Sequence, residues 1–163
     1  MSRAQLTLFA DYFQFYLQDE NAAGDLSESW TEEATANLLA LAPGTIGVGT
    51  VRNMDVRVEV EVTDIEPYVD LDRWDQVVDC SIEVPSGRLV VAGCTDYFPD
   101  AKRIEVAAGP YRARILYGGL DTLSPDGLEG DDHYLVSLWP HPVVPPRFLK
   151  RRSSGREVGW GAP

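Results

Sequence analysis

Hydrophobic and polar residues alternate along much of the chain with the period of two that is typical of β-strands. The clearest case runs from Met54 to Val62, where every second residue from Val56 onward is valine and the residues between are charged. A strand of this kind buries its β-branched face and leaves its charged face in water, as in antiparallel sheets. Residues 45–51 also form a strand pattern, and Arg52-Asn53 is predicted to be a two-residue turn between the two strands.

The same reasoning predicts eight strands in all, at 6–17, 45–51, 54–62, 74–84, 89–94, 103–106, 110–117 and 133–139. The first of these is rich in aromatic residues and is predicted to be one long or bent strand. Pro85-Ser86-Gly87 is predicted to join the fourth and fifth strands in a hairpin, and residues 107–109 to join the sixth and seventh. Prolines 140 and 142 end the last strand.

One short helix is predicted after the first strand. Ser29 is suited to cap it, Glu32 and Glu33 place acids in its first turn, and residues 34–41 favour a helix until Pro43-Gly44. Short strands joined by turns, without a strand–helix alternation, predict a mostly β fold. We therefore expect an antiparallel β-sandwich of about seven to eight strands with one short helix, and a closed barrel is the second choice.

The domain prediction is a single β-sandwich over residues 1–144, followed by a basic, flexible C-terminal tail over 145–163. The tail has no apolar period and contains the basic run Lys150-Arg151-Arg152. A disordered terminus is the simplest interpretation of this composition. The alternative is that the basic run folds back onto the acidic body and competes with a partner.

The net charge of −12 is unevenly divided. Residues 1–146 carry 9 basic and 25 acidic side chains, a charge of −16, whereas residues 147–163 carry 5 basic and 1 acidic. An acidic body repels phosphate, which argues against direct binding of nucleic acid. It permits binding of a basic protein, although acidity also keeps a protein soluble without any partner.

Two loops concentrate the acidic residues and are the predicted partner-binding sites. The candidate residues are Asp64, Glu66, Asp70, Asp72 and Asp75 in the first loop, and Asp126, Glu129, Asp131 and Asp132 in the second. Calcium is an alternative ligand, but the first loop lacks the mid-loop glycine and terminal glutamate of an EF-hand. Plain solvated loops are a further alternative. We expect neither a metal nor a cofactor.

Residues suited to catalysis are few, so we predict that the chain is not an enzyme. The only histidines are His133 and His141, and no glycine-rich phosphate loop is present. Cys80 and Cys94 would lie nearly opposite each other in the predicted hairpin, although reduced cysteines are expected over a disulfide. The first residues do not resemble a signal peptide and no segment has about 20 apolar residues, so we expect no membrane insertion and a cytoplasmic location.

Several short motifs resemble the competence protein J family. They are Trp30 to Ala34, Gly44-Thr45-Ile46, Arg52-Asn53 before the valine strand, and Arg103 to Tyr111, and the likeness in order and spacing covers roughly residues 10–140. The family's known member is a small acidic protein that inhibits a DNA-entry nuclease, so the resemblance implies an inhibitor of a partner protein. The acidic loop 64–75 and the basic tail depart from that family, and no contact residue is carried over from it. Trp30 is predicted to be a structural anchor.

The leading functional prediction is a non-catalytic protein-binding module that blocks a basic partner, a nuclease among the candidates, by electrostatic docking of its acidic loops. The alternative is a small-ligand or carbohydrate-binding sandwich in which Tyr97, Phe98, Tyr117 and Trp139 line a pocket. An enzyme ranks third. The sequence leaves the oligomeric state open.

Overall fold

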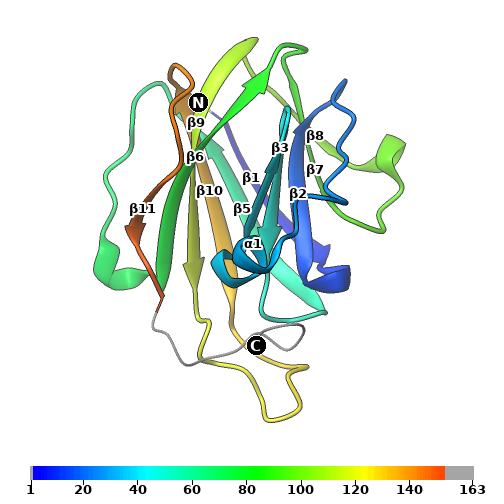
Figure 1. Cartoon of the computed structure of the whole chain (residues 1–163), viewed down its shortest axis with the longest axis vertical. Helices are drawn as coiled ribbons and strands as arrows, with labels where there is room; N and C mark the ends of the chain where they lie inside the picture. Colours follow the sequence, from blue (N-terminus) through cyan, green and yellow to red (C-terminus); the bar gives the residue numbers. More distant parts are fainter. Residues whose placement is uncertain (1, 153–163) are drawn as a thin grey trace.

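A computed structural model describes residues 2–152, which form two β-sheets packed face to face (Figure 1). One sheet has six strands in the order β1-β5-β10-β9-β6-β11, and the other has five in the order β3-β4-β2-β7-β8. The strands are β1 (Ser2–Phe9), β2 (Gln14–Asp19), β3 (Leu39–Ala42), β4 (Thr45–Gly49), β5 (Asp55–Val62), β6 (Gln76–Val84), β7 (Arg88–Gly93), β8 (Lys102–Glu105), β9 (Gly109–Gly118), β10 (His133–Pro140) and β11 (Arg147–Lys150). The helical elements are α1 (Glu32–Asn37) and the 3-10 turns η1 (Asp11–Phe13), η2 (Leu71–Arg73) and η3 (Phe98–Asp100).

The predicted fold class is confirmed: the chain is a mostly β sandwich with a single short α-helix in the part that the structure describes. All strand pairs are antiparallel except β5 with β10, which run parallel. The valine face of β5 is buried as predicted, and its charged face lies outside. Phe15 of β2 meets Tyr134 of β10 edge to face at 5.8 Å between ring centroids, which joins the two sheets through the core.

The predicted hairpins are wrong because consecutive strands enter opposite sheets. β6 lies in the six-stranded sheet and β7 in the five-stranded one, and the same separation holds for β8 and β9 and for β4 and β5. Cys80 is therefore buried in the core, Cys94 is exposed, and neither is in a disulfide. A period of two shows which face of a strand is buried, but both sheets bury a face against the same core, so the period does not identify the partner strand.

Two boundaries also differ from the prediction. The segment 6–17 is not one strand: β1 and β2 lie in different sheets, and the chain turns between them at η1. The helix is capped by Thr31, whose side chain accepts the Ala34 amide, and not by Ser29. It ends at Leu38, which has a left-handed backbone, so the residues expected to continue the helix instead form the edge strand β3.

The sheet extends beyond the expected domain boundary at residue 144. β11 pairs with β6 and forms one edge of the six-stranded sheet. The basic run at the end of β11 contacts backbone carbonyls of the body: Lys150 Nζ donates to Leu71 O at 2.8 Å, and Arg152 donates to Ala36 O at 3.0 Å. The rest of the predicted tail lies outside the described residues. Within residues 2–152, no helix is long and apolar enough to cross a membrane.

The buried hydroxyl of Tyr117 allows a direct test of the sandwich. It donates to Leu38 O at 2.6 Å, and burial raises the pKa of this phenol well above its usual value, so it stays protonated. Tyr117→Phe removes this buried hydrogen bond, although Leu38 O still accepts the Gly49 amide at 2.9 Å. The substitution is expected to lower the free energy of unfolding by about 1 kcal/mol, measured by urea titration. Tyr97→Phe, at a ring that is 70% exposed, is the control. Equal stability of the two variants would contradict this packing.

Candidate protein-docking surface

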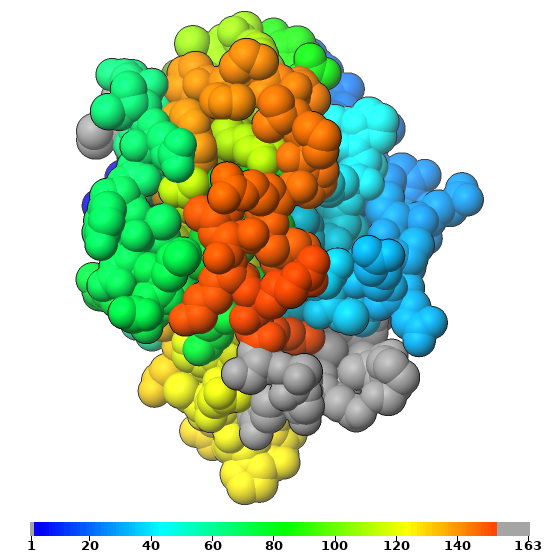
Figure 2. All heavy atoms as spheres, turned by 60° about the vertical axis from the view of Figure 1, so that its left-hand side comes forward, coloured from blue at the N-terminus to red at the C-terminus, as the bar shows by residue number. Residues whose placement is uncertain are grey.

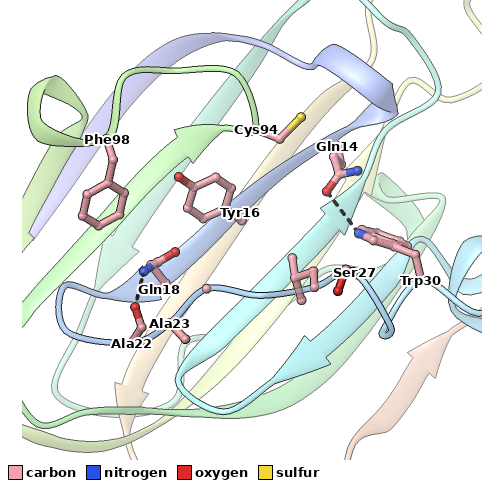
Figure 3. A pocket seen from close by; sticks show the side chains of 11 residues that line it. Gln14, Tyr16, Gln18, Ala22, Ala23, Ser27, Trp30, Cys94 and Phe98 are labelled. Carbon is pink, nitrogen blue, oxygen red and sulfur yellow. Dashed lines mark hydrogen bonds between the residues drawn. The ribbon is translucent and has the colours of Figure 1, made fainter.

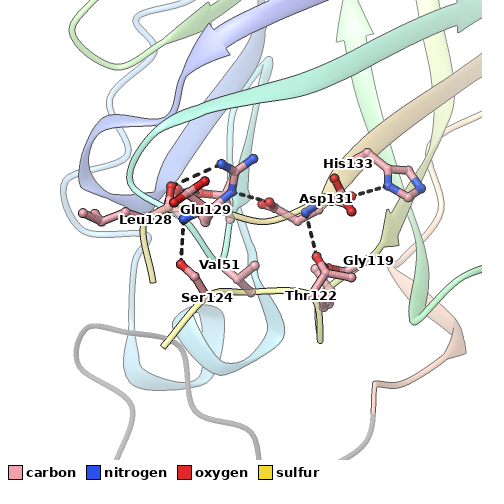
Figure 4. A network of polar contacts seen from close by, with 12 residues as sticks. Val51, Gly119, Thr122, Ser124, Leu128, Glu129, Asp131 and His133 are labelled. Atoms are coloured by element: carbon pink, nitrogen blue, oxygen red, sulfur yellow. Dashed lines mark hydrogen bonds and ion pairs between the residues drawn. The ribbon is translucent and has the colours of Figure 1, made fainter. Parts of the chain in front are cut away.

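A buried ion pair joins two loops at one end of the sandwich. Asp132 is fully buried and accepts from Arg52 Nε at 2.5 Å and from the Tyr134 hydroxyl at 2.7 Å. Arg52 also donates to Leu128 O at 3.4 Å, and the Tyr134 oxygen accepts the Val51 amide at 3.0 Å. Figure 4 shows the surrounding contacts, which include those of Ser124 and Thr122. Loop 50–54 is thus held against loop 119–132.

Burial, and then the charge of Asp132, raise the pKa of Tyr134 well above its usual value. The phenol therefore stays protonated, and its hydroxyl donates a hydrogen bond to the Asp132 carboxylate. A buried carboxylate with two donors is compensated, whereas an uncompensated one is costly. Asp132 was predicted to contact a partner, but its position beneath the surface gives it a structural role.

The same loop is fastened on its other side to the η1 turn. Phe13 donates its amide to Asn53 Oδ1 at 3.3 Å, and its carbonyl accepts the Thr50 amide at 2.9 Å. Ala10 donates its amide to Met54 O at 2.9 Å. Residues 9–13, 50–55 and 119–132 therefore form one continuous surface, which we call the end face.

The end face exposes several large apolar side chains. They are Tyr12, Leu128, Phe9 and Met54, with exposed fractions of 67%, 51%, 40% and 37%. Tyr12 and Phe13 also have left-handed backbones, with φ of 58° and 59°. Such a conformation costs roughly 1–2 kcal/mol per non-glycine residue and is found preferentially at functional sites. Sequence analysis missed Tyr12 because it placed this residue inside a continuous strand.

Five of the nine predicted acidic residues have partners within the fold: Glu66, Asp70, Asp75, Asp126 and Asp132. Glu66 pairs with Arg114 at 2.7 Å, and Asp70 accepts the Asp72 amide at the start of η2. Asp126 accepts hydrogen bonds from the Ser124 hydroxyl and the Leu128 amide. These bonds hold the pKa of Asp126 below its usual value, and the bond from Ser124 has the larger effect. Apart from Asp132, these residues stay at the surface, but their carboxylates already organise the loops.

The other four are exposed, and no carboxylate partner is found for them among residues 2–152: Asp64, Asp72, Glu129 and Asp131. The two acidic loops meet at their bases, because Asp75 accepts the Leu120 amide at 2.8 Å and donates its own amide to Tyr117 O at 2.8 Å. Trp74 and His133 pack together at 5.4 Å between ring centroids. Figure 2 shows both loops on one side of the molecule, in green and yellow. Their role in binding stays a prediction.

A separate pocket of about 470 Å³ lies on the outer face of the five-stranded sheet (Figure 3). Its lining is uncharged and includes Gln14, Tyr16 and Phe98. Trp30 borders it, donates to Gln14 Oε1 at 3.0 Å, and packs on Gly47, where a Cβ would lie 2.9 Å from its ring. These contacts agree with the predicted anchoring role of Trp30.

The aromatic residues predicted to line a ligand pocket are mostly elsewhere. Tyr117 and Trp139 are buried and Tyr97 is exposed, so only Phe98 borders the pocket. The particular residues proposed for the small-ligand alternative therefore do not form a site. Among residues 2–152, no group of three or more His, Cys, Asp or Glu side chains is placed to hold a metal ion.

No family model matches the chain, and a search of curated proteins gives no match. Two solved structures resemble it. ComJ from Bacillus subtilis, an inhibitor of the DNA-degrading activity of NucA, has a TM-score of 0.62 at 17% identity over 86% of this chain and 96% of that one. The product of crocagin biosynthetic gene J has a TM-score of 0.56 at 16% identity over 86% and 98%. The resemblance to competence protein J is thus confirmed at the level of fold.

The neighbouring carboxylates Asp131 and Asp132 provide a matched pair of variants. Asp132→Asn leaves Arg52, whose side chain is only 12% exposed, without its counter-ion. We expect a loss of about 3 kcal/mol in the free energy of unfolding. Asp131→Asn, at an exposed carboxylate, is expected to change stability by less than about 0.5 kcal/mol. Similar urea midpoints for the two variants would show that Asp132 does not hold the end face together.

Proposed function

We propose that this chain is a non-catalytic inhibitor that docks its end face and the 64–75 loop on a basic surface of a partner protein. A DNA-degrading nuclease is the first candidate for that partner. The observation that carries the proposal is the fold shared with ComJ, which inhibits the DNA-degrading activity of NucA. The end face adds exposed apolar side chains beside carboxylates that have no partner in the described residues.

Charge complementarity explains how such a surface would block a nuclease. A protein that binds nucleic acid presents lysines and arginines at phosphate spacing, and carboxylates held on fixed loops can occupy the same positions. The net charge of −12 would speed the encounter, and salt would slow it. The same charge disfavours direct binding of nucleic acid by this chain. We also propose that the protein acts in the cytoplasm.

The apolar side chains supply a second component of binding. Charged residues at the edge of an interface mainly affect the association rate, whereas buried aromatic anchors mainly affect dissociation. Tyr12 is the best placed anchor because its turn is fixed by hydrogen bonds to loop 50–54. A partner with an apolar depression bordered by basic residues would fit this surface.

Removing the four unpartnered carboxylates tests the electrostatic component. The variant Asp64→Asn, Asp72→Asn, Glu129→Gln and Asp131→Asn is expected to inhibit DNA degradation by NucA more weakly than the unchanged chain, by tenfold or more at low salt. The inhibition that remains should depend less on salt. The measurement is a nuclease titration at two or three ionic strengths.

A charge-matched control separates this surface from net charge alone. Glu28, Glu83, Asp100 and Glu105 are exposed and lie outside the two acidic loops, so neutralising them removes the same charge from elsewhere. We expect this control to inhibit nearly as well as the unchanged chain. Equal losses in the two variants would mean that only overall charge matters. If the unchanged chain itself neither binds nor inhibits NucA, that nuclease is excluded as the partner.

Tyr12→Gly is expected to separate stability from binding. Glycine adopts a φ of 58° without steric cost, so the free energy of unfolding should stay constant or rise by up to about 1 kcal/mol. Loss of the exposed ring should accelerate dissociation of the partner complex by about tenfold or more. Urea titration and surface plasmon resonance measure the two effects. Unchanged dissociation would remove Tyr12 from the interface.

A further inference from the structure

A groove of about 1000 Å³ lies on the outer face of the six-stranded sheet, away from the uncharged pocket of Figure 3. Residues of β1, β5, β9 and β10 form its floor, and residues 67–74 form one wall. Its lining includes four arginines against three carboxylates, a balance of +1 in a chain of net charge −12. Glu66 and Asp79, which pair with Arg114, are not among the lining residues, so the groove offers an anion individual arginines and not a net positive charge.

Two of these arginines are already compensated. Arg3 pairs with Glu59 and Glu61, and Arg114 pairs with Asp79 and Glu66. The other two, Arg57 and Arg73, have no ion-pair partner among residues 2–152. Their guanidinium groups are therefore available to an anion.

Both arginines line the groove together with the aromatic pair Trp74 and His133. Arg57 of β5 is directly opposite His133 of β10, so their side chains share one face of the sheet. The His133 ring packs against Trp74 at 5.4 Å, and Arg73 precedes Trp74 in the chain. The imidazole is fixed further by its Nδ1, which lies 2.9 Å from Asp131 O. This pair therefore joins the wall of the groove, through Trp74, to its floor, through His133.

A nearly fully exposed ring completes the groove. Tyr68 is 91% exposed, although the loop that carries it is clamped to the sheet. The clamp is the buried Arg114, which donates to Pro67 O at 3.2 Å and to Glu66 at 2.7 Å. Because the backbone beside Tyr68 is already fixed, a ligand that stacks on its ring costs little further loss of backbone freedom.

We propose that this groove binds a nucleoside monophosphate. The phosphate would lie between Arg57 and Arg73, because guanidinium groups bind phosphate oxygens through paired, charge-assisted hydrogen bonds. The base would stack on Tyr68, since every base has a π-face and such stacking tolerates sequence differences. A longer polynucleotide is disfavoured, because the chain has a net charge of −12 and the neighbouring loop exposes Asp64 and Asp72.

Isothermal titration calorimetry of the full chain with 5′-deoxyadenosine monophosphate in a phosphate-free buffer tests the proposal. Inorganic phosphate and deoxyadenosine are the two partial ligands, and both should bind more weakly than the nucleotide. Arg57→Gln and Arg73→Gln should each weaken binding by about tenfold or more, and Tyr68→Ala by a similar factor. Arg147→Gln is the control, at an exposed arginine of β11 that does not line the groove.

Three results would overturn the assignment: no heat of binding at millimolar nucleotide, binding that survives both arginine substitutions, or equal affinity for phosphate and nucleotide with no effect of Tyr68→Ala. The last result would reduce the groove to a simple anion site. Circular dichroism of each variant verifies that it is folded. Tyr68 and Arg73 lie in the 64–75 loop that the inhibitor proposal also uses, whereas Arg57 of β5 lies outside both that loop and the end face. The calorimetry contains no partner protein, so loss of nucleotide binding in Arg57→Gln tests the groove separately from the inhibitor proposal.

Discussion

The compensation of one buried negative charge determines how the end face of this molecule is built. Asp132 has no contact with solvent, so its carboxylate requires donors that cannot move away without a large loss of stability. Arg52 and Tyr134 are those donors, and Arg52 lies in the segment that crosses between the two sheets. Fixing this segment also fixes the η1 turn, which is hydrogen-bonded to it through Asn53. The exposed Tyr12 ring and the free carboxylates are thus carried on a preorganised surface, which lowers the entropic cost of docking.

Carboxylates in this acidic chain serve two separate purposes. Some neutralise buried arginines, as Asp79 and Glu66 do for Arg114, and Glu66 thereby holds its loop against the six-stranded sheet. Others, such as Asp131, face solvent without a partner in the described residues, and they supply the field that would attract a basic protein. The same division leaves two arginines uncompensated in the groove. Net charge alone therefore describes neither surface, because local pairing sets which charges remain available.

Sequence reasoning succeeded where the physical cause is local. The alternation from Val56 to Val62 identified a half-buried strand, the many turns identified the mostly β class, and the family resemblance identified the fold. It failed where the cause is distant in the chain. Nothing near Asp132 distinguishes it from Asp131, because Arg52 lies 80 positions away. Nor does the pattern through Tyr12 reveal a left-handed turn, since the hydrogen bonds that hold this turn come from residues 50–54.

The central claim is that the end face and the adjoining 64–75 loop form the docking surface for an inhibited partner. Amide hydrogen exchange, compared between the free chain and its complex with a nuclease such as NucA, tests this claim most directly. We expect slower exchange in the complex at residues 9–13, 50–55, 64–75 and 119–132, and no change on the outer face of the five-stranded sheet. Protection confined to the pocket around Tyr16 and Phe98, with the end face unaffected, would contradict it.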